Sequence, residues 1–236
     1  MNYKNLTLLG TSHIAKQSLD DVESTINSLK PDIVCIELDK KRLYSLMNKD
    51  KKSRIRLKDI RKIGFKGFIF SIVGAYVEKK LGQYVGVEPG SEMLKAVELS
   101  KKHKIKLMVV DQDIEKTLKR FSQEFTWKEK GKIVVDIFKA IIFRKKEIGF
   151  DLRTVPNKAT IKKLLDKVQK RYPNLYKVLI TERNEYMASK LAKIIKVNED
   201  KKVLAIVGAG HEEEMIDLIK DKKVDVVGHS YSYTVG

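Results

Sequence analysis

The chain has 236 residues, of which 42% are apolar and 34% are charged. This composition is typical of a globular protein and excludes a disordered chain. Lys and Arg (49) exceed Asp and Glu (31), giving a formal net charge of +18 that attracts anions of many kinds. The lysines are spread along the whole sequence, and it contains no zinc-finger spacing, RNP-type aromatic motif or short helix-turn-helix unit. We therefore interpret most of this charge as solvated surface and expect no specific nucleic-acid partner.

Cysteine usage and the N-terminal segment indicate the compartment. The single cysteine, Cys35, lies in the apolar run DIVCIEL and is typical of a small buried hydrophobe in a reducing environment. The first ten residues lack the basic region and the long apolar region of a signal peptide. The apolar run at 67–77 is shorter than the ~20 residues that a membrane-spanning helix needs. We expect a cytoplasmic protein without a transmembrane segment.

Five short runs rich in Val, Ile and Leu have the character of buried parallel strands. They are residues 5–10, 32–38, 106–111, 202–208 and 224–228. Helical patterns separate them: residues 18–30 place Val22, Ile26 and Leu29 on one face, with Ser18 as a plausible N-cap. A second helix opens after Gly90. This repeating βαβ order predicts an α/β fold with a mostly parallel sheet.

The middle of the chain has a different pattern. Residues 113–200 contain almost no strand-like run and predict several amphipathic helices, so we expect a helical insertion between the third and fourth of these strands. Because no low-complexity linker interrupts the chain, residues 1–236 are predicted to form one α/β domain that carries this insertion.

Two strongly apolar helical stretches, 64–82 and 131–146, are flanked by Lys and Arg. This pattern is compatible with peripheral contact with an anionic membrane surface. Packing of the two stretches on each other, or a homodimer interface, explains it equally simply. We favour the latter two interpretations, because a helical insertion needs apolar faces to stay attached to the sheet.

The motif Gly-x-x-His follows two of the predicted strands, in LLGTSHI (8–14) and in IVGAGHE (206–212). Ligands of open parallel sheets bind beyond the carboxyl ends of the strands, so the polar groups that follow the strands should meet at one rim. These groups are Gly10, Thr11, Ser12 and His13; Glu37 and Asp39; Asp111 and Asp113; and Gly208 and His211, followed by Glu212, Glu213 and Glu214.

Two imidazoles and several carboxylates at one rim suit a divalent metal ion such as Mn, Co or Zn. Such an ion would activate a water molecule and polarise a substrate carbonyl. Taken singly, each signal is weak, since a histidine at a strand end is more often structural and a strand-end acid often caps a helix. Because the motif occurs twice, we give the structural and the functional interpretation about equal weight.

A further cluster, Thr181 to Glu185, opens a predicted helix at 181–196. Thr181, Asn184 or Glu185 as helix caps are the structural interpretation. Arg183 is the functional candidate. An arginine at the start of a helix gains nothing from the macrodipole, so we predict that Arg183 reaches a carboxylate or an anionic transition state.

Four ordered segments, residues 8–46, 85–120, 180–195 and 203–219, together resemble the TraB family, also called the TraB/PrgY pheromone-shutdown family. That family is similar to the Tiki proteases and the GumN group, and more distantly to the erythromycin-esterase and ChaN-like proteins. The resemblance implies an α/β core with paired GxxH motifs. It also implies a metal-dependent peptidase site, whose ligands would be His13, Glu37 and His211.

The sequence departs from the family pattern at two places. Asp111-Gln112 stands where the family usually has Asp-Arg, and Glu182-Arg183-Asn184 stands where it has an ERD-type motif, of which Arg183 is the matching arginine. The first departure removes the basic group expected next to Asp111.

These observations predict a metal-dependent hydrolase, most simply a peptidase that acts on peptides or on an exposed protein segment. Glu37, Arg183 and His211 are the predicted catalytic residues: Glu37 is a ligand or general base, and Arg183 stabilises an oxyanion. The predicted substrate contacts are Gly10, Ser12, Asp39, Asp111, Glu182 and Gly208. The alternative is a non-enzymatic binder that sequesters a peptide signal or another anionic ligand.

Overall fold

The computed structural model describes residues 1–12, 16–48, 90–129, 131–133, 135–136 and 157–221. Within these residues five strands form one sheet in the order β1-β2-β5-β3-β4. The strands are β1 (Asn2–Tyr3), β2 (Leu6–Thr11), β3 (Ile33–Ile36), β4 (Lys106–Val109) and β5 (Val203–Gly208). Strands β2, β5, β3 and β4 run parallel, and only β1 pairs antiparallel, at the edge. The predicted α/β fold with a mostly parallel sheet is confirmed.

Four of the five predicted strands are present in the described sheet, and the fifth, at 224–228, lies outside the described residues. The two-residue strand β1 was not predicted from the sequence. Strand β5 lies at the centre, where Ala205 is the register partner of both Leu8 in β2 and Cys35 in β3. This central strand is buried along its first five residues, which explains its unbroken apolar run.

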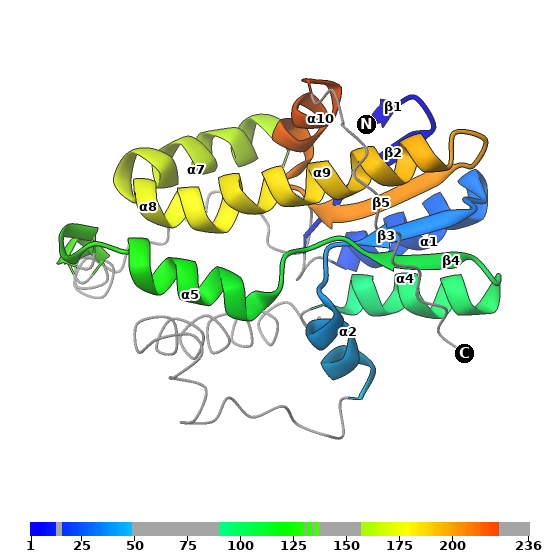
Figure 1. The fold of residues 1–236 in the computed structure, drawn as a ribbon, viewed down its shortest axis with the longest axis horizontal. Coiled ribbons are helices and arrows are strands. Elements are labelled where there is room, and N and C mark those ends of the chain that lie inside the picture. The colour runs from blue at the N-terminus through cyan, green and yellow to red at the C-terminus, as the bar shows by residue number, and fades with distance from the viewer. Residues whose placement is uncertain (13–15, 49–89, 130, 134, 137–156, 222–236) are drawn as a thin grey trace.

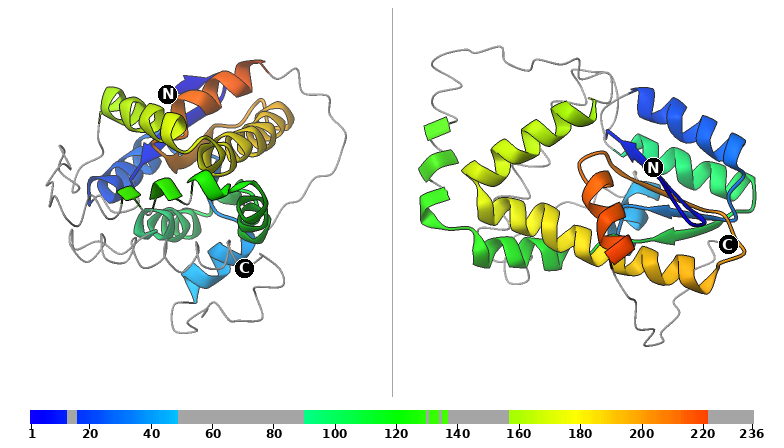
Figure 2. Two further views of the ribbon diagram at one scale, coloured as in Figure 1. Left: turned by 90° about the vertical axis from the view of Figure 1, so that its left-hand side faces the viewer. Right: turned by 90° about the horizontal axis from the view of Figure 1, so that it is seen from above.

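Helices cover both faces of the sheet (Figures 1 and 2). On one face α1 (Lys16–Leu29) and α4 (Ser91–Lys102) pack through Ile26 and Met93 against Ile36 and Ile206. On the other face α9 (Glu182–Val197) and α10 (Glu212–Asp221) pack against the side chains that alternate with these. Successive residues of a strand point to opposite faces, so the sheet fills two apolar cores at once.

The ends of the predicted helices are partly correct. The predicted helix does begin after Gly90, which adopts a left-handed φ of 80° that glycine reaches without strain. Ser18 is not an N-cap, because α1 already includes Lys16 and Ser18 lies inside its first turns. The buried Ser18 hydroxyl instead accepts the N–H of Ser12, 2.9 Å away, and so ties α1 to the segment after β2.

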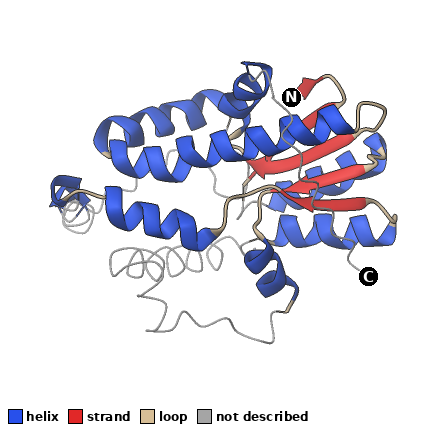
Figure 3. Ribbon diagram, in the orientation of Figure 1, coloured by secondary structure: helices blue, strands red, loops and turns tan. Residues whose placement is uncertain are grey.

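The described part of residues 113–200 is helical, as predicted, and extends beyond the carboxyl ends of the strands (Figure 3). It comprises α5 (Ile114–Glu124), α7 (Lys158–Arg171), α8 (Pro173–Tyr176), the π-helical turn η2 (Lys177–Thr181) and α9. Phe121 of α5 and Phe125, which directly follows α5, stack on each other and pack on Val178 of η2. These contacts hold α5 beside the start of α9.

The predicted cap at Thr181 is wrong. Helices α8, η2 and α9 are continuous: Thr181 has helical dihedrals, makes no side-chain cap bond, and the N–H of Glu182 bonds to the carbonyl of Lys177, five residues back. A helix that does not begin at this point needs no cap there. Helices α2 (Lys40–Met47) and α10 were not predicted from the sequence.

The apolar stretch at 64–82 lies outside the described residues, and the stretch at 131–146 is described only at 131–133 and 135–136. In the part of the chain that the structure describes, no helix has the length and apolar character needed to cross a bilayer.

Candidate functional site

The candidate site lies where the carboxyl ends of β3 and β5 meet. The chain leaves β3 for α2 and then for α4 on one face of the sheet, whereas it leaves β5 for α10 on the opposite face. Neighbouring parallel strands whose connections diverge in this way open a crevice between them. The first residue after β3 is Glu37, and the last residue of β5 is Gly208.

Glu37 is held from both sides of this crevice although only 2% of the residue is exposed. The backbone N–H of Gly208 donates to Oε2 at 2.6 Å, and Nη2 of Arg183 donates to Oε1. A buried carboxylate needs such charged and hydrogen-bonding partners. Glu37 is therefore fixed at the junction of the two strands.

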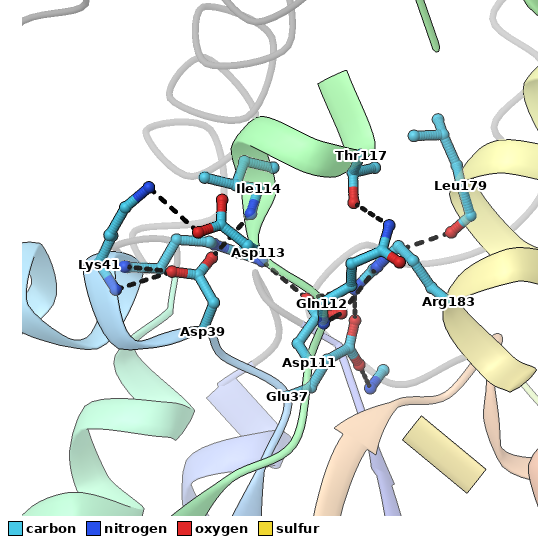
Figure 4. Close-up of polar contacts among 12 residues, drawn as sticks. Glu37, Asp39, Lys41, Asp111, Gln112, Asp113, Ile114, Thr117, Leu179 and Arg183 are labelled. Carbon is cyan, nitrogen blue, oxygen red and sulfur yellow. Dashed lines mark hydrogen bonds and ion pairs between the residues drawn. The ribbon is translucent and has the colours of Figure 1, made fainter. Parts of the chain in front are cut away.

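Arg183 connects the ends of β3 and β4 (Figure 4). It forks onto Asp111, from Nε to Oδ1 at 3.0 Å and from Nη2 to Oδ2 at 2.9 Å, while Nη2 also donates to Glu37. Burial opposes the charge of Arg183, but Glu37 and Asp111 outweigh it and hold the pKa of the guanidinium above its ordinary value. The site therefore contains a permanent cation between two buried carboxylates.

Nη1 of Arg183 makes the remaining contacts of this side chain. It donates to the carbonyl of Leu179 in η2 at 3.1 Å and lies 3.4 Å from Nε2 of His211. The argument that placed Arg183 at a helix start was wrong, since α9 continues from η2. The prediction that Arg183 reaches a carboxylate is confirmed, with Asp111 and Glu37 as its partners.

His211 lies directly before α10 and is 6% exposed. Its Nε2 is 3.3 Å from Oε1 of Glu37, so the imidazole, the carboxylate and the guanidinium meet at one point. Its Nδ1 lies 2.5 Å from Oδ1 of Asn184 in α9. The Nε2 edge of the ring is thus the edge that faces the charged cluster.

A cleft of about 300 Å³ opens over this cluster. Its lining includes Thr11, Ser12, Glu37, Arg183, Gly208 and His211. A larger cleft of about 510 Å³, between α7 and the start of α10, adjoins it and shares Ile161, Ala209 and Gly210 with it. A ligand at His211 therefore has space to extend along α7.

The other predicted substrate contacts are placed differently. Asp39 caps α2 through the N–H groups of Lys41 and Arg42 and also accepts the N–H of Ile114, so its oxygens are occupied by the backbone. Glu182 receives both donors of a guanidinium fork from Arg120 of α5, at 2.6 and 3.1 Å.

Gly10 serves the packing of the rim. A Cβ at this position would lie 3.1 Å from the backbone of Ala209, closer than side chains normally approach. The loop after β5 can therefore lie directly against the end of β2, where the N–H of Ala209 donates to the carbonyl of Thr11.

Of the three predicted metal ligands, His13 lies outside the described residues. Among the residues that are described, no group of three or more His, Cys, Asp or Glu is arranged to hold a metal ion. Glu37 and His211 present two donor atoms 3.3 Å apart, which one ion with ligand distances of ~2.1 Å can span. The guanidinium of Arg183 contacts the same oxygen of Glu37.

Sequence reasoning missed two residues of this cluster. Arg42 of α2 donates to Oδ2 of Asp111 at 3.3 Å, so a basic group does lie next to Asp111. The side chain of Gln112 bonds to Thr117 instead. Asn184 was considered only as a cap, yet it is fully buried against His211. The asparagine inside an otherwise apolar helical face was the available signal.

Known proteins with similar sequences identify the family of this chain. The pattern of the TraB/PrgY/gumN family matches residues 2–227. The chain belongs to this family. It is 34% identical, over 93% of its length and 54% of the relative, to an uncharacterised protein of Methanocaldococcus jannaschii. It is 23% identical to the TraB domain-containing proteins of Mus musculus and Homo sapiens, over 76% of its length and 50% of theirs. The chain thus spans about half the length of these relatives.

Proposed function

We propose that this TraB-family chain is a hydrolase that cleaves acyl bonds, with peptides or an exposed protein segment as substrate. The convergence of Glu37, Arg183 and His211 beneath one cleft carries the proposal. The choice of peptides rests on the resemblance to the Tiki proteases. A base, a cation and an adjoining cleft are the elements that attack of water on a carbonyl requires.

His211 is the group best placed to take a proton from water. Both oxygens of Glu37 already accept hydrogen bonds, from Arg183 and from Gly208, whereas Nε2 of His211 has only the longer contacts of 3.3 and 3.4 Å. We assign general-base catalysis to His211. Glu37 orients the guanidinium and balances its charge.

Arg183 is the group that we propose to stabilise the oxyanion. Its fork is committed to Asp111, and one hydrogen of Nη1 is committed to Leu179, so the hydrogen directed towards His211 is the one available to a substrate oxygen. A carbonyl oxygen bound there would be stabilised as it becomes an oxyanion. Binding of the carbonyl oxygen to Nη1 of Arg183 would leave Nε2 of His211 facing the water.

A divalent ion (Mn, Co or Zn) stays a prediction. The described residues offer two ligands, fewer than the three protein ligands of a catalytic zinc site, and the third predicted ligand is His13. If bound, the ion would lower the pKa of a water molecule and polarise the carbonyl. Elemental analysis of protein purified without added metal tests this part by itself, and a metal-free active protein would contradict it.

The test of the function is cleavage of a peptide library by the purified chain, with and without Mn, Co or Zn, followed by mass spectrometry. His211→Ala should lower turnover by about 10²–10⁴-fold, the usual contribution of a general base. His103→Ala is the matched control, because His103 is exposed at the end of α4. Full turnover by the His211 variant would exclude this mechanism.

The second candidate is a binder that sequesters a peptide signal or another anionic ligand. The ion pairs of Arg183 with Glu37 and Asp111 support it, because a group that already neutralises two carboxylates need not act in a reaction. Saturable binding of library peptides that yields no product, at every metal tested, would favour the binder over the hydrolase.

A further inference from the structure

Asn184 and Glu214 form a hydrogen-bonded chain behind His211. Asn184 lies in the first turn of α9 and is fully buried, and Glu214 lies in the first turn of α10. Nδ2 of Asn184 donates to Oε2 of Glu214 at 2.8 Å, and Oδ1 of Asn184 lies 2.5 Å from Nδ1 of His211. The two helices pack against each other, so this chain spans their contact.

The carboxylate of Glu214 decides which way the amide of Asn184 is turned. An ionised carboxylate has no hydrogen to give, so it must face the NH₂ group of the amide rather than its oxygen. The opposite orientation would place an amide oxygen against a carboxylate oxygen inside a partly buried contact, where unpaired acceptors are costly. With Nδ2 directed at Glu214, Oδ1 is the atom that faces His211.

The orientation of the amide in turn decides the tautomer of His211. Oδ1 can only accept, so the ring nitrogen 2.5 Å away must carry the hydrogen. In the neutral ring the hydrogen is therefore on Nδ1, and the lone pair is on Nε2. Nε2 is the atom that lies beside Glu37 and Arg183 under the cleft.

We infer that Asn184 is a positioning residue that, held by Glu214, keeps neutral His211 in the Nδ1–H form with the Nε2 lone pair directed at the cleft. This inference rests on the proposed function only for its consequence, because the Nδ1–H form is the one that can act as a base or a ligand at the cleft. The tautomer itself is a property of the resting protein. It can be measured without any substrate.

The experiment is two-dimensional ¹H–¹⁵N NMR of the imidazole nitrogens in the uniformly ¹⁵N-labelled chain, at a pH at which the signal of His211 reports the neutral ring. The chain has four histidines, and the His211→Gln spectrum identifies the signal of interest. In the wild-type protein His211 should show the pattern of a protonated Nδ1 and an unprotonated Nε2. A predominant Nε2–H pattern would overturn the inference.

Asn184→Leu should lose the Nδ1–H pattern, whereas Asn184→Asp should retain it, because a carboxylate still accepts from Nδ1. Glu214 is only half-buried, so the Glu214→Ala variant should fold and keeps the test valid if the Asn184→Leu variant does not. It should mix the two tautomers, since nothing then fixes the amide. Unchanged Nδ1–H populations in both the Leu and the Ala variants would contradict the roles of Asn184 and Glu214.

Asn198→Ala is the matched control. Asn198 ends the same helix and bonds to the backbone of Ile194, so its loss perturbs α9 without touching His211. This control should leave the tautomer unchanged. The two proposals fail separately: an Nδ1–H pattern without peptide cleavage removes the hydrolase, and cleavage with an Nε2–H pattern removes the role of Asn184.

Discussion

The ends of β3 and β4 carry the same short pattern, an acid, one intervening residue and a second acid: Glu37 and Asp39 after β3, and Asp111 and Asp113 after β4. The first acid of each pair is buried and binds Arg183. The second acid of each pair caps the helix that follows, α2 or α5. One sequence signal therefore has two uses, and position within the pair decides which.

The difference follows from where the chain turns. After β3 and β4 the backbone keeps pairing for one or two residues, as in the bonds from Val110 to Ile36 and from Asp111 to Leu38, and this holds the first acids inside the rim. The second acids lie where the chain turns into a helix. The first backbone N–H groups of a helix have no acceptor within the helix, and the carboxylate supplies one. Of these four acids, the first of each pair is the one that reaches Arg183 in the candidate site.

The strongest way to break this comparison is Asp111→Ala. It removes the two-pronged partner of a guanidinium whose side chain is only 15% exposed, and it also removes the partner of Arg42. Loss of one member of a buried ion pair costs about 3–5 kcal/mol, and because Glu37 remains we expect about 3 kcal/mol less free energy of unfolding. Urea denaturation of the wild type and the variant measures this loss in the free energy of unfolding.

Asp111→Asn keeps an acceptor and loses the charge, so its cost should be intermediate. A loss below about 1 kcal/mol for Asp111→Ala, within the range of exposed pairs, would show that the first acids are no different from the second.

The next effect concerns the capping acids. Asp39→Ala should lower the free energy of unfolding by about 1–2 kcal/mol, since it removes an N-cap and leaves the N–H of Ile114 without its acceptor. Amide hydrogen exchange should accelerate at Lys41 and Ile114. Asp113→Ala, which loses one cap bond at a more exposed site, should cost less. Equal or reversed costs would contradict this ranking.

The smallest effect depends on pH. Burial opposes ionisation of Asp113, but its ion pair with Lys41 and the N–H of Glu115 outweigh burial and hold its pKa below the ordinary value. A depressed folded-state pKa contributes stability above the unfolded value of about 3.9, and this contribution disappears as the pH falls through the folded-state value. The pair is exposed, so the gain is under about 1 kcal/mol.

Asp113→Asn isolates this contribution because asparagine caps helices as well as aspartate does. The difference in free energy of unfolding between wild type and this variant should be present at neutral pH and approach zero in acid. A difference that grows on acidification would contradict the assignment.

Much of the rim could be predicted from the sequence. Runs of Val, Ile and Leu indicated four of the described strands, and the rule that parallel strands end at one edge brought Glu37, Asp111, Gly208 and His211 together. The failures concern the starts of two helices. Ser18 and Thr181 have the chemistry of caps, but each lies within a helix that begins earlier in the chain.

The sequence by itself determined the α/β class, the two buried faces of the strands and the family, because these depend on local periodicity and ordered motifs. Only the tertiary structure decided that β5 inserts between β2 and β3 and that α9 brings Arg183 and Asn184 to the rim. Strand order and side-chain partners depend on contacts between residues far apart in the chain, 146 positions in the case of Glu37 and Arg183, and no local pattern encodes them.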